Sequence, residues 1–279
     1  MNDFTILVNT CDKYEDAWDP FFKLFKINWP QSKNYKIVLN TENKDYKCDF
    51  LDITTLRTGN EVAWSKRLKT ALESIETEYV LFFLEDFFLR SPVNQEMFEE
   101  ALDLIKSDDE IGYIGLKYSP ERVFKRKNFM PKDRFFSRDY LATKSRITAM
   151  SVLWRREWLL ELIDEKEDPW DFERNASVRS REYSYKVLEI NNLNGVCPPV
   201  FDFEDKIKYG YGITQGQWLP RNKDLFEKYG IKVNFDNLGI NYKLYEDANA
   251  VSDNKKNNAK KKNLIEYLYE IKKKIIGKR

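Results

Sequence analysis

Tyr79-Val-Leu-Phe-Phe-Leu84 is the most hydrophobic run of the chain, and it stops abruptly at Glu85-Asp86. The run is too short to span a bilayer, and its continuous apolar character is typical of a strand buried on both faces of a sheet. Two shorter runs of the same kind, residues 4–8 and 35–39, also end in polar residues. These runs predict a sheet whose strands end at clusters of polar side chains.

Helical spacing of apolar residues separates the strand-like runs. We expect helices near residues 18–29, 62–75, 95–106, 156–163 and 179–190, and further strands at residues 111–116 and 147–154. Alternating strands and helices predict an α/β fold with a mixed, mainly parallel sheet flanked by helices. Ligands of such open sheets bind beyond the carboxyl ends of the strands, so the polar clusters there are the candidate binding residues.

Histidine is absent from all 279 residues. This excludes Ser-His-Asp and Cys-His nucleophile pairs and a histidine general base, so any proton transfer falls to carboxylates, lysine or tyrosine. The three cysteines, Cys11, Cys48 and Cys197, lie far apart and form no Cys-x-x-Cys motif, which disfavours a structural zinc site. Any catalytic metal is therefore expected to be a hard divalent cation held by oxygen, Mn²⁺ or Mg²⁺.

The net charge of +1 hides an asymmetry along the chain. Residues 255–279 carry ten Lys or Arg and two Glu, a net +8, so the other 254 residues carry −7. An acidic body argues against a nucleic-acid partner. The basic segment has an aliphatic stripe at helical spacing, which is typical of a helix lying on an anionic membrane surface. Docking of this helix on the acidic body or on another subunit is the competing interpretation.

The adjacent carboxylates of Glu85 and Asp86 are the strongest local signal of chemistry. Carboxylates at the end of a buried strand face a crevice, where they can hold Mg²⁺ or Mn²⁺ against the phosphates of a nucleotide. The alternative is that both residues cap the turn after the strand and stay solvated.

The order of elements resembles the GT-A-type, nucleotide-sugar-dependent glycosyltransferases of bacterial surface-polysaccharide synthesis (capsule and lipopolysaccharide). The resemblance covers roughly the first 190 residues: a strand ending in a polar loop, a second strand, and a helix leading into a hydrophobic strand ended by acids. It implies a GT-A-like (Rossmann-like) sheet and a nucleotide pocket at Asn9, Thr10, Asp12 and Glu42. It also implies that Glu85 and Asp86 contact the donor diphosphate or a metal. The acidic motif of the family is usually Asp-x-Asp, and Leu84 stands here where its first acid is expected.

The resemblance suggests roles for two further groups of residues. Lys66 and Arg67 open the helix before the acidic strand, where the family often contacts the donor; an exposed basic first turn is the alternative. Inverting members carry the catalytic base near Asp171 and Glu173, since a sugar hydroxyl attacks well only as its proton is removed. We expect Glu173, or else Asp171, to be this base and Trp170 to stack on the acceptor sugar. A helix start at residues 168–173 explains the same acids without catalysis.

The expected organisation follows from the resemblance and the composition. Residues 1–248 would form the catalytic domain, with a nucleotide-sugar half over 1–116 and an acceptor half over 117–248 that includes a lid near 209–218. Residues 249–262 would form a linker, and residues 263–279 the basic amphipathic helix. The basic, aromatic stretch 117–144 would meet an anionic lipid-linked acceptor, or else form an ordinary solvated loop.

The resemblance implies transfer of a sugar, with inversion of its anomeric configuration expected, from a nucleotide-diphosphate donor to a lipid-linked or growing surface glycan. Sparse cysteines and the lack of a signal-peptide pattern at the N-terminus predict a cytoplasmic protein, and the basic segment predicts a peripheral position at the inner face of the plasma membrane. Two other interpretations remain: a non-catalytic nucleotide-binding subunit of a polysaccharide-assembly complex, and a sugar nucleotidyltransferase. The second lacks a Gly-rich loop near the first strand to cradle a triphosphate.

Overall fold

The hydrophobic run forms strand β4 (Tyr79–Leu84), which pairs with a parallel strand on one side and an antiparallel strand on the other. The computed structural model describes residues 3–116, 134–137, 146–190, 200–201 and 212–242. The chain forms two units, one of Met1–Glu204 with Phe226–Asn234 and the other of Asp205–Leu225 with Phe235–Arg279. The sheet and the candidate site belong to the first unit.

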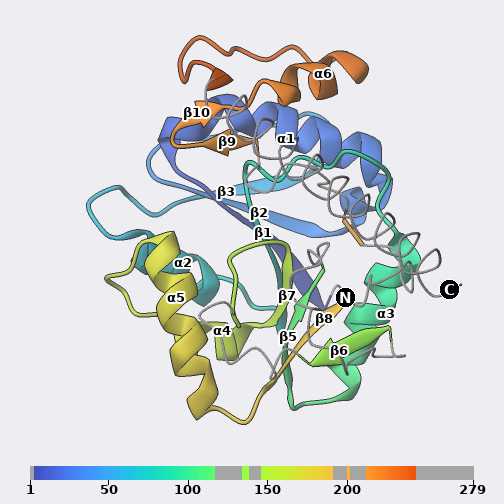
Figure 1. Ribbon diagram of the computed structural model, residues 1–279, viewed down its shortest axis with the longest axis vertical. Helices are drawn as coiled ribbons and strands as arrows, with labels where there is room; N and C mark the ends of the chain where they lie inside the picture. The colour runs from blue at the N-terminus through green and yellow to red at the C-terminus, as the bar shows by residue number, and fades with distance from the viewer. Residues whose placement is uncertain (1–2, 117–133, 138–145, 191–199, 202–211, 243–279) are drawn as a thin grey trace, which may run out of the picture. The chain divides into compact units, whose positions relative to one another are not determined.

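The first part of this unit alternates strands and helices, as predicted (Figure 1). Its elements are β1 (Phe4–Asn9), η1 (Asp12–Tyr14), α1 (Glu15–Asn28), η2 (Pro30–Asn34), β2 (Lys36–Thr41), β3 (Ile53–Arg57), α2 (Trp64–Glu73), β4, α3 (Gln95–Ser107) and β5 (Ile111–Gly115). The elements that follow in this unit are β6 (Phe135–Ser137), β7 (Val152–Arg155), α4 (Arg156–Leu162), α5 (Pro169–Arg179), η4 (Ser180–Glu182) and β8 (Lys186–Ile190).

The described strands of this unit form one eight-stranded sheet in the order β3-β2-β1-β4-β7-β5-β8-β6. Strands β3, β2, β1 and β4 are parallel to one another, and β5 is parallel to β8. Strand β7 is antiparallel to both β4 and β5, and β6 is antiparallel to β8. The expected α/β fold, with a mixed and mainly parallel sheet flanked by helices, is therefore confirmed.

This topology gathers several chain segments at one edge of the sheet. The carboxyl ends of β1, β2, β3 and β4 share that edge because these strands are parallel. Val152, the first residue of β7, pairs with Phe82 near the end of β4, so the residues just before β7 lie at the same edge. Segments that lie far apart in the sequence consequently meet at the edge where ligands of open sheets bind.

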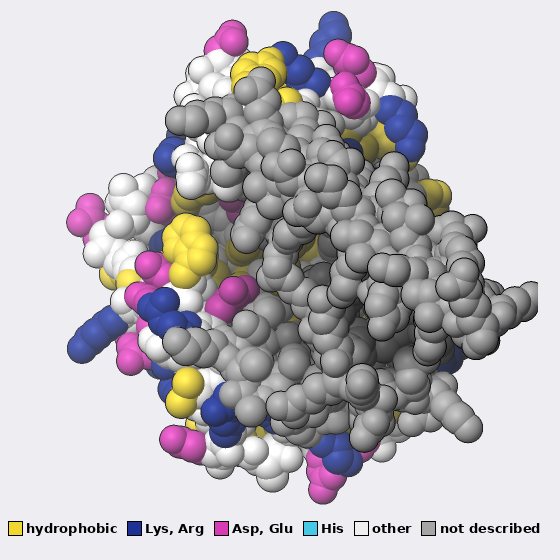
Figure 2. Space-filling model, in the orientation of Figure 1, with side chains coloured by type: hydrophobic (Ala, Val, Ile, Leu, Met, Phe, Trp, Pro, Cys, Tyr) yellow, Lys and Arg dark blue, Asp and Glu magenta, His cyan; other side chains and the backbone are white. Residues whose placement is uncertain are grey.

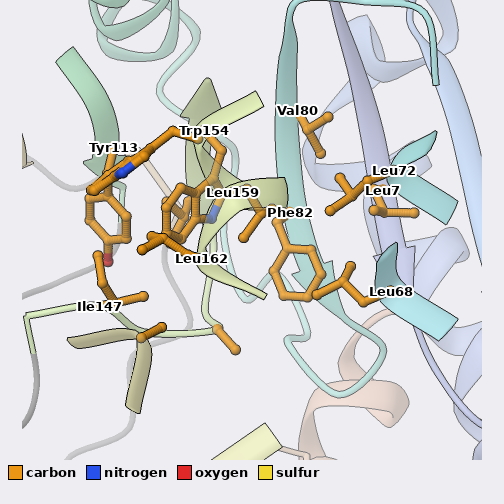
Figure 3. Close-up of a cluster of buried hydrophobic side chains, with 14 of the residues drawn as sticks. Leu7, Leu68, Leu72, Val80, Phe82, Tyr113, Ile147, Trp154, Leu159 and Leu162 are labelled. Carbon is orange, nitrogen blue, oxygen red and sulfur yellow. The ribbon is translucent and has the colours of Figure 1, made fainter. Parts of the chain in front are cut away.

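Alternation along the strands sends side chains into two apolar layers. One layer joins Leu7, Val80 and Phe82 of the sheet to Leu68 and Leu72 of α2 and to residues of α4 and α5 (Figure 3). The opposite layer is aromatic: the ring of Phe83 packs edge-on against Phe25, at 5.3 Å between centroids, and against Phe201, at 5.2 Å. Burial of these large side chains supplies most of the driving force for folding.

Packing is tight where β5 meets α4. A Cβ atom built on Gly112 would lie 2.3 Å from Cε3 of Trp158, whose ring is fully buried. Glycine is therefore required here because the indole ring of α4 approaches the strand backbone.

Three details of the expected secondary structure are wrong. The helix expected at 179–190 is a short 3-10 turn followed by β8. A short segment of this kind is compatible with both helical and strand periodicity, and its hydrogen bonding to β5 and β6 makes it a strand. The strand expected at 147–154 starts only at Val152, because side chains of α5 accept the N–H groups of Ile147 and Ala149. Strand β3 was not expected, since its half-exposed sequence has no continuous apolar run.

The second unit contains β9 (Ile213–Thr214) and β10 (Gln217–Trp218), which pair as an antiparallel hairpin. Helix α6 (Arg221–Lys228) follows and runs across the boundary between the units. The hairpin covers the described part of the expected lid at 209–218; whether that segment closes over a ligand stays a prediction.

Several predicted segments lie outside the described residues: nearly all of the basic stretch 117–144, the linker 249–262 and the basic helix 263–279. The division of residues 1–248 into two halves stays a prediction. In the described part of the chain, no helix is long and apolar enough to cross a membrane. Acidic and basic side chains are interspersed over the described part of the face in Figure 2.

Candidate active site

Two buried asparagines connect the ends of β1 and β2. Asn40 donates through Nδ2 to Oδ1 of Asn9 at 2.5 Å, and its own Oδ1 accepts from the hydroxyl of Thr58 at 2.9 Å. Nδ2 of Asn9 has no acceptor among the described residues. Buried polar groups of this kind are normally satisfied, so an unmatched donor beside the strand ends is notable for a binding site.

Arg67 of α2 extends into the same region and is buried. Its Nη1 donates to the carbonyl oxygen of Thr10 at 2.9 Å, and its Nη2 lies 3.8 Å from Oε1 of Glu42. The sequence gives a signal for this burial, because Arg67 falls next to Leu68 and four residues before Ala71 on the buried face of α2. A permanently charged guanidinium is thus held at the carboxyl ends of the strands.

Asp12 and Glu42 bind each other's backbone. The amide of Asp12 donates to Oε2 of Glu42 at 3.0 Å, and the amide of Glu42 donates to Oδ1 of Asp12 at 3.1 Å. The carboxylate of Asp12 also accepts the N–H groups of Asn43 and Lys44. These bonds shape the two loops that follow β1 and β2, and the predicted nucleotide contacts of both residues stay predictions.

Glu85 is buried in the turn after β4, where the amide of Phe87 donates to the carbonyl of Leu84 at 3.3 Å. Burial and the adjacent charge of Asp86 raise the pKa of Glu85 to about 8. A hydrogen bond from Thr10 and the charge of Arg67 act in the opposite direction but do not cancel the shift. Asp86 is half-buried. The pair therefore concentrates more negative charge than its surroundings accommodate.

Two residues near this pair were not among the predicted site residues. Burial raises the pKa of the Cys11 thiol to about 11, and the charges of Glu85 and Glu42 act in the same direction. Burial also raises the pKa of Tyr14 to about 12, with Cys11, Glu85 and Asp86 contributing. Both groups therefore stay neutral at physiological pH beside the carboxylates. Their place directly after β1 was the only available signal.

Helix α5 carries the acids predicted for proton transfer. Asp168 caps its first turn by accepting the amide of Asp171 at 2.7 Å, and Pro169 is its first residue, so the helix start proposed as the alternative is present. The side chain of Asp171 pairs with Arg174. Oε1 of Glu173 accepts the amide of Ala149 at 2.7 Å. Because residue 149 lies just before β7, this bond ties Glu173 to the edge of the sheet where β4 ends.

The two remaining predicted residues, Trp170 and Lys66, have different surroundings. Trp170 is 73% exposed, which is unusual for so large an apolar side chain. Lys66 pairs with Glu165 at 2.8 Å, and Lys69 binds the same carboxylate at 2.6 Å. The structure therefore brings Arg67, and not Lys66, to the strand ends. A role of Trp170 toward an acceptor and of Lys66 toward a donor stays a prediction.

A divalent cation would need ligands beyond those that the protein supplies here. Among the described residues, no group of three or more Cys, Asp or Glu side chains is placed to hold a metal ion. Mg²⁺ usually takes one or two carboxylates together with substrate phosphates and waters. Glu85 and Asp86 fit that pattern, since a cation would offset both the burial and the charge of Asp86 that raise the pKa of Glu85. They fit it only together with the phosphates of a donor.

No protein-family model and no curated protein matches the chain. Solved structures are similar to parts of it. TarS 1–349 of S. aureus in complex with UDP-GlcNAc is 14% identical, with a TM-score of 0.45 over 67% of this chain and 55% of that one. The mannosyltransferase PcManGT from Pyrobaculum calidifontis, in complex with GDP-Man and Mn²⁺, is 13% identical, with a TM-score of 0.43 over 66% of this chain and 53% of that one.

A cytidylyltransferase from Leptospira borgpetersenii is also similar, at 12% identity and a TM-score of 0.43, over 68% of this chain and 76% of that one. The chain spans a little over half the length of the TarS 1–349 structures that it matches. At these identities, with TM-scores below 0.5, the similarity identifies neither the family nor the activity of this chain.

Proposed function

We propose that this protein is a nucleotide-sugar-dependent glycosyltransferase. The observation that carries the proposal is the buried guanidinium of Arg67 at the carboxyl ends of the parallel strands, between Thr10 and Glu42. A helix with an exposed tryptophan and a carboxylate, Trp170 and Glu173 of α5, is tied to the same edge. Sugar transfer from such a donor requires a cationic group that stabilises the leaving diphosphate and a carboxylate that accepts the proton of the acceptor hydroxyl.

In the proposed reaction, Glu173 takes the proton of an acceptor hydroxyl while the oxygen of that hydroxyl attacks the anomeric carbon of the donor sugar. The bond from that carbon to the diphosphate oxygen breaks, the nucleoside diphosphate leaves, and the anomeric configuration is inverted. Trp170 would stack on the apolar face of the acceptor sugar. Asp171 is the second candidate base, although its pairing with Arg174 holds its carboxylate on the helix surface.

Negative charge develops on the departing diphosphate, and Arg67 is placed to stabilise it through charge-assisted hydrogen bonds. A divalent cation bound by Glu85 and Asp86 would supply further charge neutralisation. Asn9, Thr10, Asp12 and Glu42 would form the nucleotide pocket, in which Nδ2 of Asn9 is an available donor. Lys66 would have to exchange its bond with Glu165 for the donor.

The acceptor in this proposal is a lipid-linked or growing bacterial surface glycan, of the capsule or lipopolysaccharide type. The basic residues within 255–279 would bring the enzyme to the anionic inner face of the plasma membrane, where such acceptors reside.

Calorimetric titration with UDP and with GDP, each with and without Mn²⁺, tests the donor site. We expect one of the two nucleoside diphosphates to bind. Loss of this binding in folded Arg67→Met would locate the nucleotide site at Arg67. Binding without any effect of Mn²⁺ would remove the metal from the proposal. No binding of either nucleotide would refute the donor site itself.

Substitution of the proposed base tests the chemistry. Glu173→Gln should keep nucleotide binding while sugar transfer and donor hydrolysis fall by about a hundredfold or more, because general-base catalysis contributes on that scale. Glu161→Gln, an exposed carboxylate of α4, is the matched control and should retain full activity. Full turnover in Glu173→Gln would transfer the role to Asp171 or elsewhere. Nucleotide binding without transfer or hydrolysis by the unmodified protein would indicate a non-catalytic subunit.

A further inference from the structure

Helices α2 and α5 are joined at their N-terminal ends by a reciprocal pair of hydrogen bonds. The amide of Ser65 donates to the carbonyl of Glu167 at 3.1 Å, and the amide of Glu167 donates to the hydroxyl of Ser65 at 2.9 Å. Beside them the rings of Trp64 and Phe172 lie 5.7 Å apart. The joint therefore connects the helix that carries Arg67 to the helix that carries the candidate base.

The carboxylate of Glu167 at this joint is buried and fully engaged. Arg179, at the last turn of α5, binds it with both nitrogens of its fork, Nη1 to Oε1 and Nη2 to Oε2, each at 2.7 Å. Asn175 donates to the same Oε1 at 2.8 Å. Arg179 also donates to the carbonyl of Leu162, at the end of α4, at 3.0 Å and 2.6 Å. One guanidinium thus connects the end of α4, the segment before α5 and the end of α5.

Attachment of α5 to the core does not depend on this ion pair. Phe172 and Ala176 anchor the helix in the apolar layer, and Ser177 accepts the amide of Ile147 at 2.9 Å. Glu167 is buried and Arg179 is partly buried, and the loss of hydration in such a pair offsets much of the attraction, so the pair is a poor source of net stability. A bidentate pair does impose a definite geometry on the groups that it joins. The Glu167–Arg179 pair is therefore suited to fix where the first turn of α5 lies along α2.

We propose that Glu167 and Arg179 are positioning residues that hold the first turns of α5, with Glu173 and Trp170, at a set distance from Arg67 of α2. Neither residue touches the substrate in this proposal, which rests on the proposed function. Loss of the pair would let α5 shift while the core remains intact. The donor would still bind, but the base would be misplaced relative to the anomeric carbon.

Hydrolysis of UDP- and GDP-sugars provides a readout that needs no acceptor glycan, because water then takes the acceptor's place. In Glu167→Gln and Arg179→Met, kcat for hydrolysis should fall by about a hundredfold, the usual result of a displacement of roughly 1 Å. The KM for the donor and the affinity for the nucleoside diphosphate should stay within about twofold. Arg179→Lys keeps the charge but loses the fork, and should recover part of kcat.

Two further variants control for misfolding and for the general effect of breaking an ion pair near α2. The double variant Glu167→Gln/Arg179→Met leaves no unpaired buried charge, so it should fold even where a single variant does not, with kcat still reduced. Lys69→Gln breaks an exposed ion pair at the same joint and should leave kcat unchanged.

The possible outcomes are distinct. A wild-type protein that neither binds nucleoside diphosphates nor hydrolyses their sugars would refute the proposed function, and this inference with it. A hydrolysing wild type whose folded variants keep its kcat, with only a lower melting temperature, would refute the positioning role alone. Equal losses of kcat and donor affinity would also refute it.

Discussion

Replacement of Glu85 by glutamine should make the stability of the protein less sensitive to pH. Burial and Asp86 raise the pKa of Glu85 from its ordinary value of 4.5 to about 8. The folded state therefore holds the proton of Glu85 more tightly than the unfolded state does. Between these two values stability falls as pH rises, because unfolding releases the proton; below pH 4.5 the group costs nothing, and above pH 8 the full cost is present.

The size of the effect follows from the two pKa values. Linkage gives a loss on the order of 1 kcal/mol at pH 5.5 and on the order of 4 kcal/mol at pH 7.5, as upper estimates for a carboxyl group coupled to a neighbour. Glutamine keeps the shape of the protonated carboxyl group and does not titrate. The free energy of unfolding of Glu85→Gln relative to wild type should therefore increase between these pH values, by about 3 kcal/mol at most.

Urea unfolding followed by tryptophan fluorescence at pH 5.5 and 7.5, with EDTA present to remove cations, measures this difference. Any constant effect of the amide cancels when the two pH values are compared. Glu161→Gln, on the surface of α4, is the control and should change with pH as the wild type does. A difference between Glu85→Gln and wild type that is the same at both pH values, or that shrinks at pH 7.5, would show that the carboxyl group is not held in its neutral form.

Three further predictions concern packing, charge and the basic segment. Gly112→Ala should lower the free energy of unfolding by about 1–3 kcal/mol in a urea titration, because the new methyl group would meet the ring of Trp158; unchanged stability would show that α4 yields. Arg67→Met should cost about 3 kcal/mol, since it leaves Glu42 without its counter-charge and the carbonyl of Thr10 without its donor, and should weaken UDP or GDP binding in calorimetry; wild-type affinity would remove Arg67 from the site. Removal of residues 255–279 should abolish sedimentation with anionic phosphatidylglycerol vesicles while nucleotide binding persists, and undiminished sedimentation would contradict the membrane role.

Much of the site was accessible from the sequence because strand ends are visible in it. The hydrophobic run that stops at Glu85 predicts a buried strand and a polar edge, and parallel pairing then places Asn9 and Asn40 beside each other. The choice of Glu173 over Asp171 rested on resemblance alone. The contact of Glu173 with Ala149 depends on the antiparallel pairing of β7 with β4, and no local pattern in the sequence predicts that pairing.

Apolar periodicity in the sequence determined the α/β class and the strand boundaries near the candidate site, because burial on both faces imposes a recognisable pattern on each segment by itself. Partner choice was decided only by the tertiary structure. Arg67 reaches Thr10 while the adjacent Lys66 turns to Glu165, and Glu167 meets Arg179 twelve residues away. These choices depend on the distance and direction between segments, and a linear pattern of residue types records neither.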